Sequence, residues 1–220
     1  MLFRSLPYDP IRDFTPIGRI SLSQHVLVVN PSLKATSVQE LVQLARAQPN
    51  KLSYTTSNAG SLVSAEWLKA MAQVDIVGVP YNSNPAALND VIAGRIQVMF
   101  PDQNTATPLV VSGKLRALAV TGSARSHNLP ELPTMQEAGF KGFTINVWSG
   151  IYGPAGLPPA IVAQVSRALD QVLKTPATLE KFASLGSTPS PMSPEQFAQF
   201  GRSELEVWQR AIAAAKIELQ

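Results

Sequence analysis

The chain contains no cysteine and only two histidines among its 220 residues. The absence of cysteine excludes disulfides, thiol catalysis and zinc–thiolate sites. The histidines are poorly placed for acid–base chemistry, because His25 lies in an apolar, strand-like segment and His127 lies in a polar loop with no paired acid nearby in sequence. No nucleophile elbow, phosphate-binding loop, dinucleotide fingerprint or metal-ligand cluster is present. We therefore expect no enzyme activity, no cofactor and no metal site.

Charge is also scarce, since Asp, Glu, Lys and Arg make up 15% of the chain and the net charge is +3. Lys and Arg are scattered rather than gathered in a stripe, so we expect no nucleic-acid partner. No apolar run is long enough to span a membrane. Residues 1–7 lack the basic start and the extended apolar core of a signal peptide, so the chain as written is expected to remain in the cytoplasm.

The chain is rich in apolar residues, which make up 45% of it and allow one large domain or two small ones with a buried core. Two apolar runs, residues 52–61 and 76–85, each pass into a small polar loop and then into a helical pattern, at 63–72 and 86–93. A helix that begins after such a loop leaves backbone N–H groups unpaired, and these attract anions. Two such loops close together predict a pocket for a small carboxylate or phosphate.

Capping signals and apolar periodicity predict the remaining elements. Ser37 and Glu40 form a capping box before one helix, Thr134 and Glu137 form a second before a short helix that stops at Gly139, and Ser193 opens a third. In the second loop, Asn84 is the expected N-cap and Pro85 the expected first helical residue. Extended segments are expected at 17–30, 96–100, 115–121 and 143–153, and further helices at 106–112, 159–173, 176–185 and 194–215.

Alternating strands and helices before residue 154 predict an α/β fold with a mainly parallel, doubly wound sheet. The C-terminal part differs, because it supplies three helices but hardly any strand on which to bury their apolar faces. Either the extended segment at 17–29 serves this purpose, or further strands belong upstream of residue 1.

Five segments, taken together and in order, resemble the Bug (TctC-like) substrate-binding proteins of tripartite tricarboxylate transporters. The resemblance covers essentially the whole chain, and its segments are LPYDPIRDFTP (6–16), PYNSNPA (80–86), GKLRALAVT (113–121), LPTMQEAG (132–139) and WSGIYGPAG (148–156).

The resemblance implies a periplasmic-binding-protein type II-like fold, in which two α/β lobes joined by two crossing strands close on a small carboxylate. Lobe 1 would comprise residues 1–27 and 147–220, and lobe 2 residues 28–146. Complete members carry a signal peptide and a first strand–loop–helix, which this chain lacks, so lobe 1 is expected to be incomplete at its N-terminus. By the resemblance, the protein would be periplasmic.

The expected ligand-binding residues come from two loops and one strand end. The first loop departs from the family pattern, because Asn58 stands where glycine is usual and Ser64 where a histidine is usual. The alternatives are that Ser61 only caps a helix and that the second loop is an ordinary turn. Asp102 is left out, since the family acid is at the place of Pro101, and Trp148 is assigned to hinge packing. The expected residues are Ser57, Asn58, Gly60, Ser61, Tyr81, Asn82, Ser83, Asn84, Pro85 and Thr121.

The leading hypothesis is a monomeric solute-binding protein that performs no chemistry and holds its ligand in an interlobe cleft. The ligand would be a small organic carboxylate, namely a di- or tricarboxylate, an amino acid or an aromatic acid. Its partners would be the membrane subunits of the transporter if the protein is exported. The alternatives are an N-terminally truncated relative with impaired binding and, less favoured, a small hydrolase.

Overall fold

The structure, a computed structural model, describes residues 7–56, 58–184 and 187–217. The chain divides into two compact units. Unit 1 contains the residues up to Ser23 together with Trp148–Arg210, and unit 2 contains Gln24–Val147 together with Ala211–Ile217. The lobe boundaries inferred from the resemblance, after residues 27 and 146, stay a prediction.

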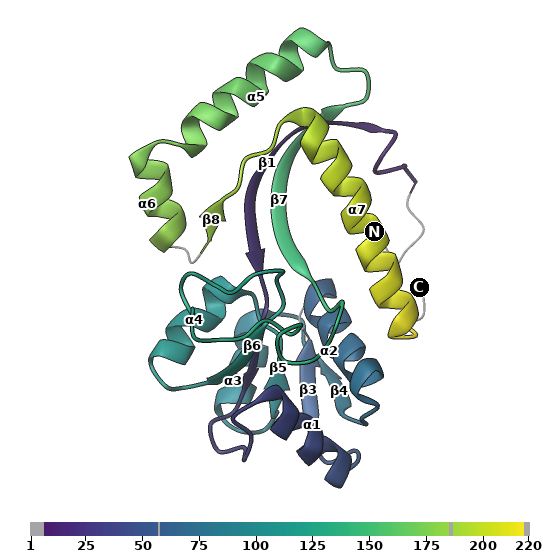
Figure 1. The fold of residues 1–220 in the computed structure, drawn as a ribbon, viewed down its shortest axis with the longest axis vertical. Coiled ribbons are helices and arrows are strands. Elements are labelled where there is room, and N and C mark those ends of the chain that lie inside the picture. The colour runs from purple at the N-terminus through teal and green to yellow at the C-terminus, as the bar shows by residue number, and fades with distance from the viewer. Residues whose placement is uncertain (1–6, 57, 185–186, 218–220) are drawn as a thin grey trace. The chain divides into compact units, whose positions relative to one another are not determined.

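Unit 2 is built on a five-stranded sheet whose strand order is β4-β3-β5-β2-β6. Figure 1 labels β3, β4, β5 and β6 of this sheet. β3 pairs in parallel with β4 and with β5, whereas β2 pairs antiparallel with β5 and with β6. The sheet is therefore mixed: β2 runs opposite to the other strands, so two pairings are parallel and two are antiparallel, whereas a mainly parallel sheet was predicted. The strands are β2 (Val26–Val29), β3 (Ser53–Thr56), β4 (Val77–Pro80), β5 (Val98–Met99) and β6 (Arg116–Val120).

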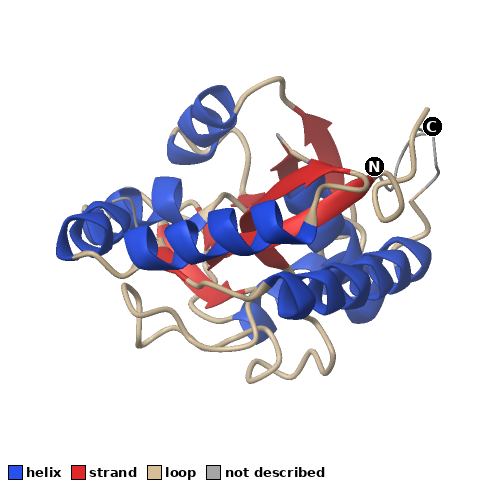
Figure 2. Cartoon of the chain, turned by 90° about the horizontal axis from the view of Figure 1, so that it is seen from above, coloured by secondary structure: helices blue, strands red, loops and turns tan. Residues whose placement is uncertain are grey.

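Four helices complete unit 2, and three of them directly follow a strand of the sheet. α2 (Ala59–Ala72) follows β3, α3 (Asn84–Ile92) follows β4, and α4 (Gln103–Val111) follows β5. Figure 2 shows the helices and strands by colour.

α1 (Val38–Ala47) begins at the predicted cap, where the Ser37 hydroxyl accepts from the backbone N–H of Glu40 at 3.1 Å. The Glu40 carboxylate does not complete the box, because it accepts from the backbone N–H and hydroxyl of Thr36.

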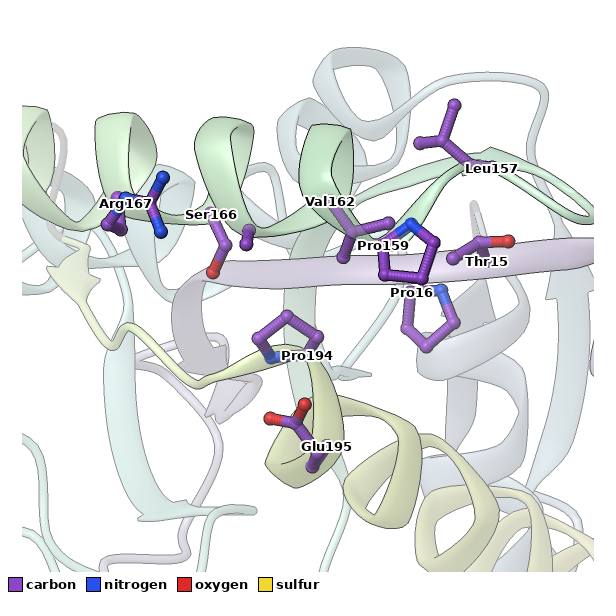
Figure 3. Close-up of a pocket in the computed structure, with 10 residues that line it drawn as sticks. Thr15, Pro16, Leu157, Pro159, Val162, Ser166, Arg167, Pro194 and Glu195 are labelled. Atoms are coloured by element: carbon purple, nitrogen blue, oxygen red, sulfur yellow. The ribbon is translucent and has the colours of Figure 1, made fainter.

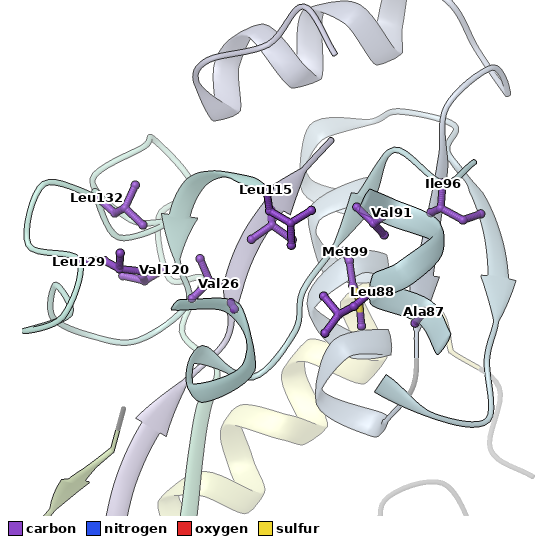
Figure 4. Close-up of a cluster of buried hydrophobic side chains, with 12 residues drawn as sticks. Val26, Ala87, Leu88, Val91, Ile96, Met99, Leu115, Val120, Leu129 and Leu132 are labelled. Atoms are coloured by element: carbon purple, nitrogen blue, oxygen red, sulfur yellow. The ribbon is translucent and has the colours of Figure 1, made fainter. Parts of the chain in front are cut away.

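The core of unit 2 gathers around β2, whose four residues are all fully buried. Fully burying an aliphatic side chain of this kind contributes about 1.5–3 kcal/mol. A strand covered on both faces has apolar side chains at every position, so its sequence shows no alternation of apolar and polar residues. Figure 4 shows one cluster of this core, made of Val26, Val28, Ala87, Leu88, Val91, Ile96, Met99, Ala106, Leu115, Val120, Leu129 and Leu132.

Unit 1 contains a three-stranded sheet of order β7-β1-β8, formed by β1 (Phe14–Gln24), β7 (Asn146–Pro154) and β8 (Thr188–Pro189). β1 pairs antiparallel with β8 through Ser21 opposite Pro189 and Leu22 opposite Thr188. The extended segment at residues 17–29 is thus shared between β1 and β2, while β8 was not predicted.

The C-terminal helices are α5 (Pro159–Leu173), α6 (Pro176–Ser184) and α7 (Pro194–Ala214). The predicted box at the start of α7 is complete, since the Ser193 hydroxyl accepts from the N–H of Gln196 and the Gln196 side chain accepts from the N–H of Ser193. Trp148 packs edge-on against Phe197 and Phe200, which agrees with its assignment as a packing residue.

α5 is amphipathic, yet Leu173 is its one buried residue in the structure. Three of its apolar side chains stay exposed, namely Ile161, Val165 and Val172. The helix that was expected to lack a covering partner therefore does present apolar side chains at the surface.

The predicted helix after Thr134 is wrong. Its capping box does form, because the Thr134 hydroxyl accepts from the N–H of Glu137 and the Glu137 carboxylate accepts from the N–H of Thr134. However, the segment makes only turns. Gly139 and Gly142 both adopt positive φ angles directly afterwards, so the chain leaves the helical region before a second turn can form.

Candidate functional site

The predicted anion-binding loops lie at one edge of the sheet of unit 2. β3, β4 and β5 are parallel, and each is followed by a loop and the start of a helix. The carboxyl ends of parallel strands share one edge, and this edge is where open α/β sheets bind ligands. Three helix N-termini there bring partial positive charge and backbone N–H groups to the same place.

α2 is capped by Asn58, whose side-chain oxygen accepts from the N–H of Ser61 at 2.8 Å. Ser61 is thus the third helical residue, and the alternative that Ser61 caps this helix is wrong. The hydroxyls of Ser61 and Ser64 are fully buried and have no hydrogen-bond partner within the described part of the chain. Ser57 lies outside the described residues.

α3 is capped one residue earlier than predicted. Ser83 is the N-cap, so Asn84 and Pro85 occupy the first turn, and the assignment of Asn84 as the N-cap is wrong. The Ser83 hydroxyl makes no capping hydrogen bond and is exposed, as are Asn82 and Pro85. The start of α3 therefore presents an unused hydroxyl to solvent.

Tyr81 behaves differently from its neighbours. Its hydroxyl donates to the Asp90 carboxylate, which raises the pKa of Tyr81, and Asp90 is also paired with Arg95 at 2.7 Å. The ring packs against the core cluster of unit 2. A ligand contact by Tyr81 stays a prediction, and the hydroxyl would first have to leave Asp90.

α4 begins after Asp102, which occupies the N-cap position without using its side chain as a cap. Instead, Asp102 Oδ1 lies 3.3 Å from Nε2 of His25, and Asp102 Oδ2 accepts from the side-chain amide of Asn84 at 3.1 Å. The hydrogen bond from His25 lowers the pKa of Asp102 against the opposing effect of burial, and the bond from Asn84 lowers it further. Asp102 thus connects the start of α4 to the start of α3.

His25 connects the site to α2 and β6. A Cβ atom placed on Gly60 would lie 2.4 Å from Cε1 of His25, so the imidazole rests directly on the first turn of α2. The backbone N–H of His25 donates to the hydroxyl of Thr121 at 3.0 Å, and that hydroxyl donates to the carbonyl of Ile145 at 2.7 Å. The Thr121 side chain is fully buried, and its hydroxyl links the backbone of His25 to that of Ile145.

The structure thus joins three of the predicted residues, Gly60, Asn84 and Thr121, through two residues that were not predicted. His25 had been placed only in an apolar, strand-like segment and Asp102 had been left out of the expected site. No motif could have found the pair, because their contact depends on the position of β2 beside β5. The sequence signal that existed was weak: His25 directly precedes β2, and Asp102 lies in the loop after β5. Ligand contact by the predicted residues stays a prediction.

A second hollow lies within unit 1. It is an open groove of about 540 Å³ between the start of β1, one side of α5 and the start of α7 (Figure 3). Leu157, Pro159, Val162 and Pro194 give it a mainly apolar wall, with Arg167 and Glu195 at its edge. It contains none of the predicted binding residues, and although the first residues of α5 and α7 line it, their wall is mainly apolar, so we take the edge of the sheet in unit 2 as the candidate anion site.

Among residues 7–56, 58–184 and 187–217, no group of three or more His, Asp or Glu side chains is placed to hold a metal ion. None of the helices described is both long enough and apolar enough to cross a membrane.

A sheet with helix N-termini at the carboxyl edge of its parallel strands is an α/β arrangement suited to holding anions, and comparison with known proteins identifies the family. The model of the "Tripartite tricarboxylate transporter family receptor" family, TctC, matches residues 1–217. The chain belongs to this family. The family model describes a receptor, and the similar solved structure of BugD, 27% identical with a TM-score of 0.84, is described as a periplasmic binding protein.

Among curated relatives, the "UPF0065 protein in tcbD-tcbE intergenic region" of Pseudomonas sp. (strain P51) is 31% identical over 96% of this chain. Protein BugT of Bordetella pertussis is 30% identical over 94% of it. The chain spans 64% of the length of each of these two relatives.

Solved structures confirm the predicted fold class. R. palustris Rpa4515 with adipate has a TM-score of 0.88 and 31% identity, covering 99% of this chain and 74% of that chain. MatC from Rhodopseudomonas palustris with bound malate has a TM-score of 0.82 and 27% identity, covering 96% of this chain and 74% of that chain.

Proposed function

We propose that this chain is the solute-binding receptor of a tripartite tricarboxylate-type transporter and that it binds a small organic carboxylate. One observation carries the proposal. The starts of α2, α3 and α4 meet at the carboxyl edge of the unit 2 sheet, and Gly60, His25, Asp102 and Asn84 link them. Helix N-termini bind carboxylates through backbone N–H groups and the helix dipole.

The α3 start contributes most directly to the proposed site. Its N-cap hydroxyl, on Ser83, makes no capping bond and is exposed, so it can donate to a ligand oxygen. Asn82 and Pro85 are exposed beside it, and the α2 start contributes Asn58 and Gly60. Recognition of this kind depends on backbone and hydroxyl groups, with water completing the remaining contacts.

Similar proteins support the ligand chemistry. Rpa4515 was solved with adipate and MatC with malate, which are both dicarboxylates, and each shares the fold of this chain over almost its whole length. From its family we propose a periplasmic protein that delivers its ligand to membrane subunits of the transporter, and we propose that it acts as a monomer. Closure of two lobes on the ligand belongs to the same proposal.

A thermal-shift screen followed by calorimetry tests the proposal. The panel contains succinate, adipate, malate, citrate, L-aspartate, L-glutamate and benzoate, each at saturating concentration, with sodium chloride at matched ionic strength as the control. A ligand at one hundred times its Kd stabilises the native state by about 2.7 kcal/mol. For a chain of this size, such stabilisation raises Tm by about 5–10 °C. If no carboxylate in the panel raises Tm above the chloride control, the proposal is wrong.

A further inference from the structure

The edge of the unit 2 sheet opposite the candidate site gathers positive charge. β3, β4, β5 and β6 begin at this edge, and β2, which runs the other way, ends there. We call it the amino edge. Of the nine lysines and arginines between Gln24 and Val147, six lie in the loops and helix ends at this edge, namely Lys34, Arg46, Lys51, Arg95, Lys114 and Arg116.

The arginines of this set are engaged, whereas the lysines are not. Arg46 donates to the carbonyl of Ala72 at 2.7 Å, and Arg95 pairs with Asp90 at 2.7 Å. Among the described residues no acid forms an ion pair with the three lysines, and all three are exposed. A lysine without a partner is a mobile point charge, while fixed anion recognition uses arginine forks. The amino edge therefore presents a spread positive charge rather than a pocket for one anion.

The three lysines belong to one surface. Lys51 and Lys114 each lie two residues before a strand, β3 and β6, and these strands are three spacings apart in the sheet, or about 14 Å. Lys34 lies in the loop after β2. Arg116, the first residue of β6, holds this loop by donating to the carbonyls on either side of Lys34, at 2.9 and 3.1 Å.

Acidic side chains offset only part of this charge. Three acids lie at the amino edge: Asp90, already paired; Glu40, which accepts from the residue before its helix cap; and Asp75, which is exposed in the loop before β4. Nearby, Lys69 in the last turn of α2 is neutralised by Glu66 at 2.8 Å. Six cations against three acids leave three positive charges at this edge, as many as the net charge of the whole chain.

Exposed apolar side chains accompany the lysines. Val111, the last residue of α4, is 76% exposed, more than any other large apolar side chain in the described part of the chain, and it lies three residues before Lys114. Val77, the first residue of β4, is also exposed. Lysines beside exposed apolar side chains fit a lipid interface, because the lysines attract headgroup phosphates and the apolar groups enter the headgroup layer.

We propose that the amino edge of unit 2 docks on a membrane surface rich in anionic phospholipid, through Lys34, Lys51, Lys114 and Val111. The contact is peripheral and reversible, since each lysine near such a surface strengthens binding about fivefold. The candidate anion site lies at the opposite edge of the same sheet, so docking does not cover it. This inference does not depend on which solute the protein binds.

Flotation with lipid vesicles tests the inference. Vesicles of phosphatidylcholine alone are compared with vesicles that also contain phosphatidylglycerol, at low and at physiological ionic strength. We expect the chain to float with the anionic vesicles at low ionic strength and not with the neutral ones. Binding should weaken as the Debye length falls to about 8 Å at physiological ionic strength. If the wild-type chain does not float with anionic vesicles at low ionic strength, the inference is wrong.

A charge-reversed variant tests the surface itself. Lys34→Glu, Lys51→Glu and Lys114→Glu combined should lower the vesicle partition coefficient at least about a hundredfold. Asp75→Asn should do the opposite and raise it about fivefold, because it removes an acid whose backbone adjoins that of Asn50, next to Lys51. Circular dichroism checks folding, and Asp75→Asn decides the matter if the triple variant does not fold.

A second triple variant controls for net charge. Lys181→Glu, Arg202→Glu and Arg210→Glu change three exposed cations of unit 1 that form no ion pair within the described residues, and they lower the net charge by the same amount. This variant should keep most of the vesicle binding. Equal losses in both triple variants would overturn the inference, because overall charge would then explain the binding.

Two further measurements complete the test. Val111→Ser should weaken vesicle binding, and poly-L-glutamate should not replace the vesicles as a partner; binding of the polypeptide without binding of anionic vesicles would mean an acidic protein partner and overturn the inference. Calorimetry with the carboxylate panel should give the same Kd for the amino-edge variant and the wild type. Failure of vesicle binding therefore leaves the proposed function standing, and failure of carboxylate binding leaves this inference standing.

Discussion

The imidazole of His25 occupies the space that a side chain at Gly60 would need. A Cβ atom on Gly60 would stand 2.4 Å from Cε1 and 2.9 Å from Nε2 of His25, both closer than real Cβ atoms approach. The glycine is therefore required by the histidine and not by its backbone angles. This contact brings the first turn of α2 against the residue that holds Asp102.

Gly60→Ala should consequently destabilise the protein although alanine favours helix. The overpacked contact costs about 1–3 kcal/mol, which exceeds the gain of about 1 kcal/mol from helix propensity. Urea unfolding measures the difference. Gly201→Ala in α7 is the matched control, because its Cβ would meet only the Tyr152 hydroxyl at 3.5 Å, an ordinary contact. It should leave stability unchanged or increase it, and equal losses in both variants would contradict the argument.

Two N-cap serines should differ in how much stability they lose when the hydroxyl is removed. Ser37→Ala loses a capping bond to the N–H of Glu40 and should lower the free energy of unfolding by about 1 kcal/mol. Ser83→Ala loses no capping bond, so its stability should stay within about 0.5 kcal/mol of wild type.

The same two variants separate stability from binding. If the Ser83 hydroxyl donates to the ligand, Ser83→Ala weakens carboxylate binding and Ser37→Ala leaves Kd unchanged. Thermal unfolding and calorimetry on the two proteins give all four values. A large stability loss in Ser83→Ala would show that its hydroxyl caps α3 after all.

Thr121→Val should destabilise unit 2 by about 1–3 kcal/mol, because it leaves the buried N–H of His25 and the carbonyl of Ile145 without the hydroxyl between them. Thr121→Ser retains that hydroxyl and serves as the control. Urea unfolding followed by tryptophan fluorescence compares the two. The account fails if the serine variant loses as much stability as the valine variant.

The lowered pKa of Asp102 predicts a pH dependence. A carboxyl whose pKa is depressed in the folded state adds stability above the ordinary value of about 3.9, and this stability disappears as pH falls through the depressed value. The wild type should therefore be more stable than Asp102→Asn at neutral pH, and the difference should shrink below about pH 4. Urea unfolding at pH 7, 5, 4 and 3 measures it. A difference that persists unchanged at pH 3 would contradict the role of the His25 contact.

Local signals predicted most of the helices, because each depends on neighbours in sequence, although the capping box at Thr134 formed without the helix it predicted. Ser37 caps α1, and the Ser193 box opens α7. The N-cap of α3 was predicted one residue too late. Ser83 and Asn84 follow one another, and serine and asparagine cap helices about equally well. The predicted cap at Asn84 became a donor to Asp102 instead.

The site itself depended on information that the sequence pattern does not contain. His25 contacts Asp102 because β2 lies between β5 and β6 in the sheet and pairs antiparallel with both. An apolar run such as Val26–Val29 predicts a buried strand but not which strands flank it. The contact of Gly60 with His25 follows from the same strand order. Neither this contact nor the contact of His25 with Asp102 could therefore be predicted from local sequence patterns.

The position of β2 also affects how the protein is made. β2 is synthesised before both of its neighbours, and it must wait for β5 and β6 while residues 30–115 are translated. Until then β2 has no neighbouring strand to pair with, so its four apolar side chains stay exposed. Pairing between strands far apart in sequence is also intrinsically slow. A ribosome-bound chain halted before Val98 should therefore be digested readily by protease and held by chaperones, whereas one released beyond Val120 should resist digestion.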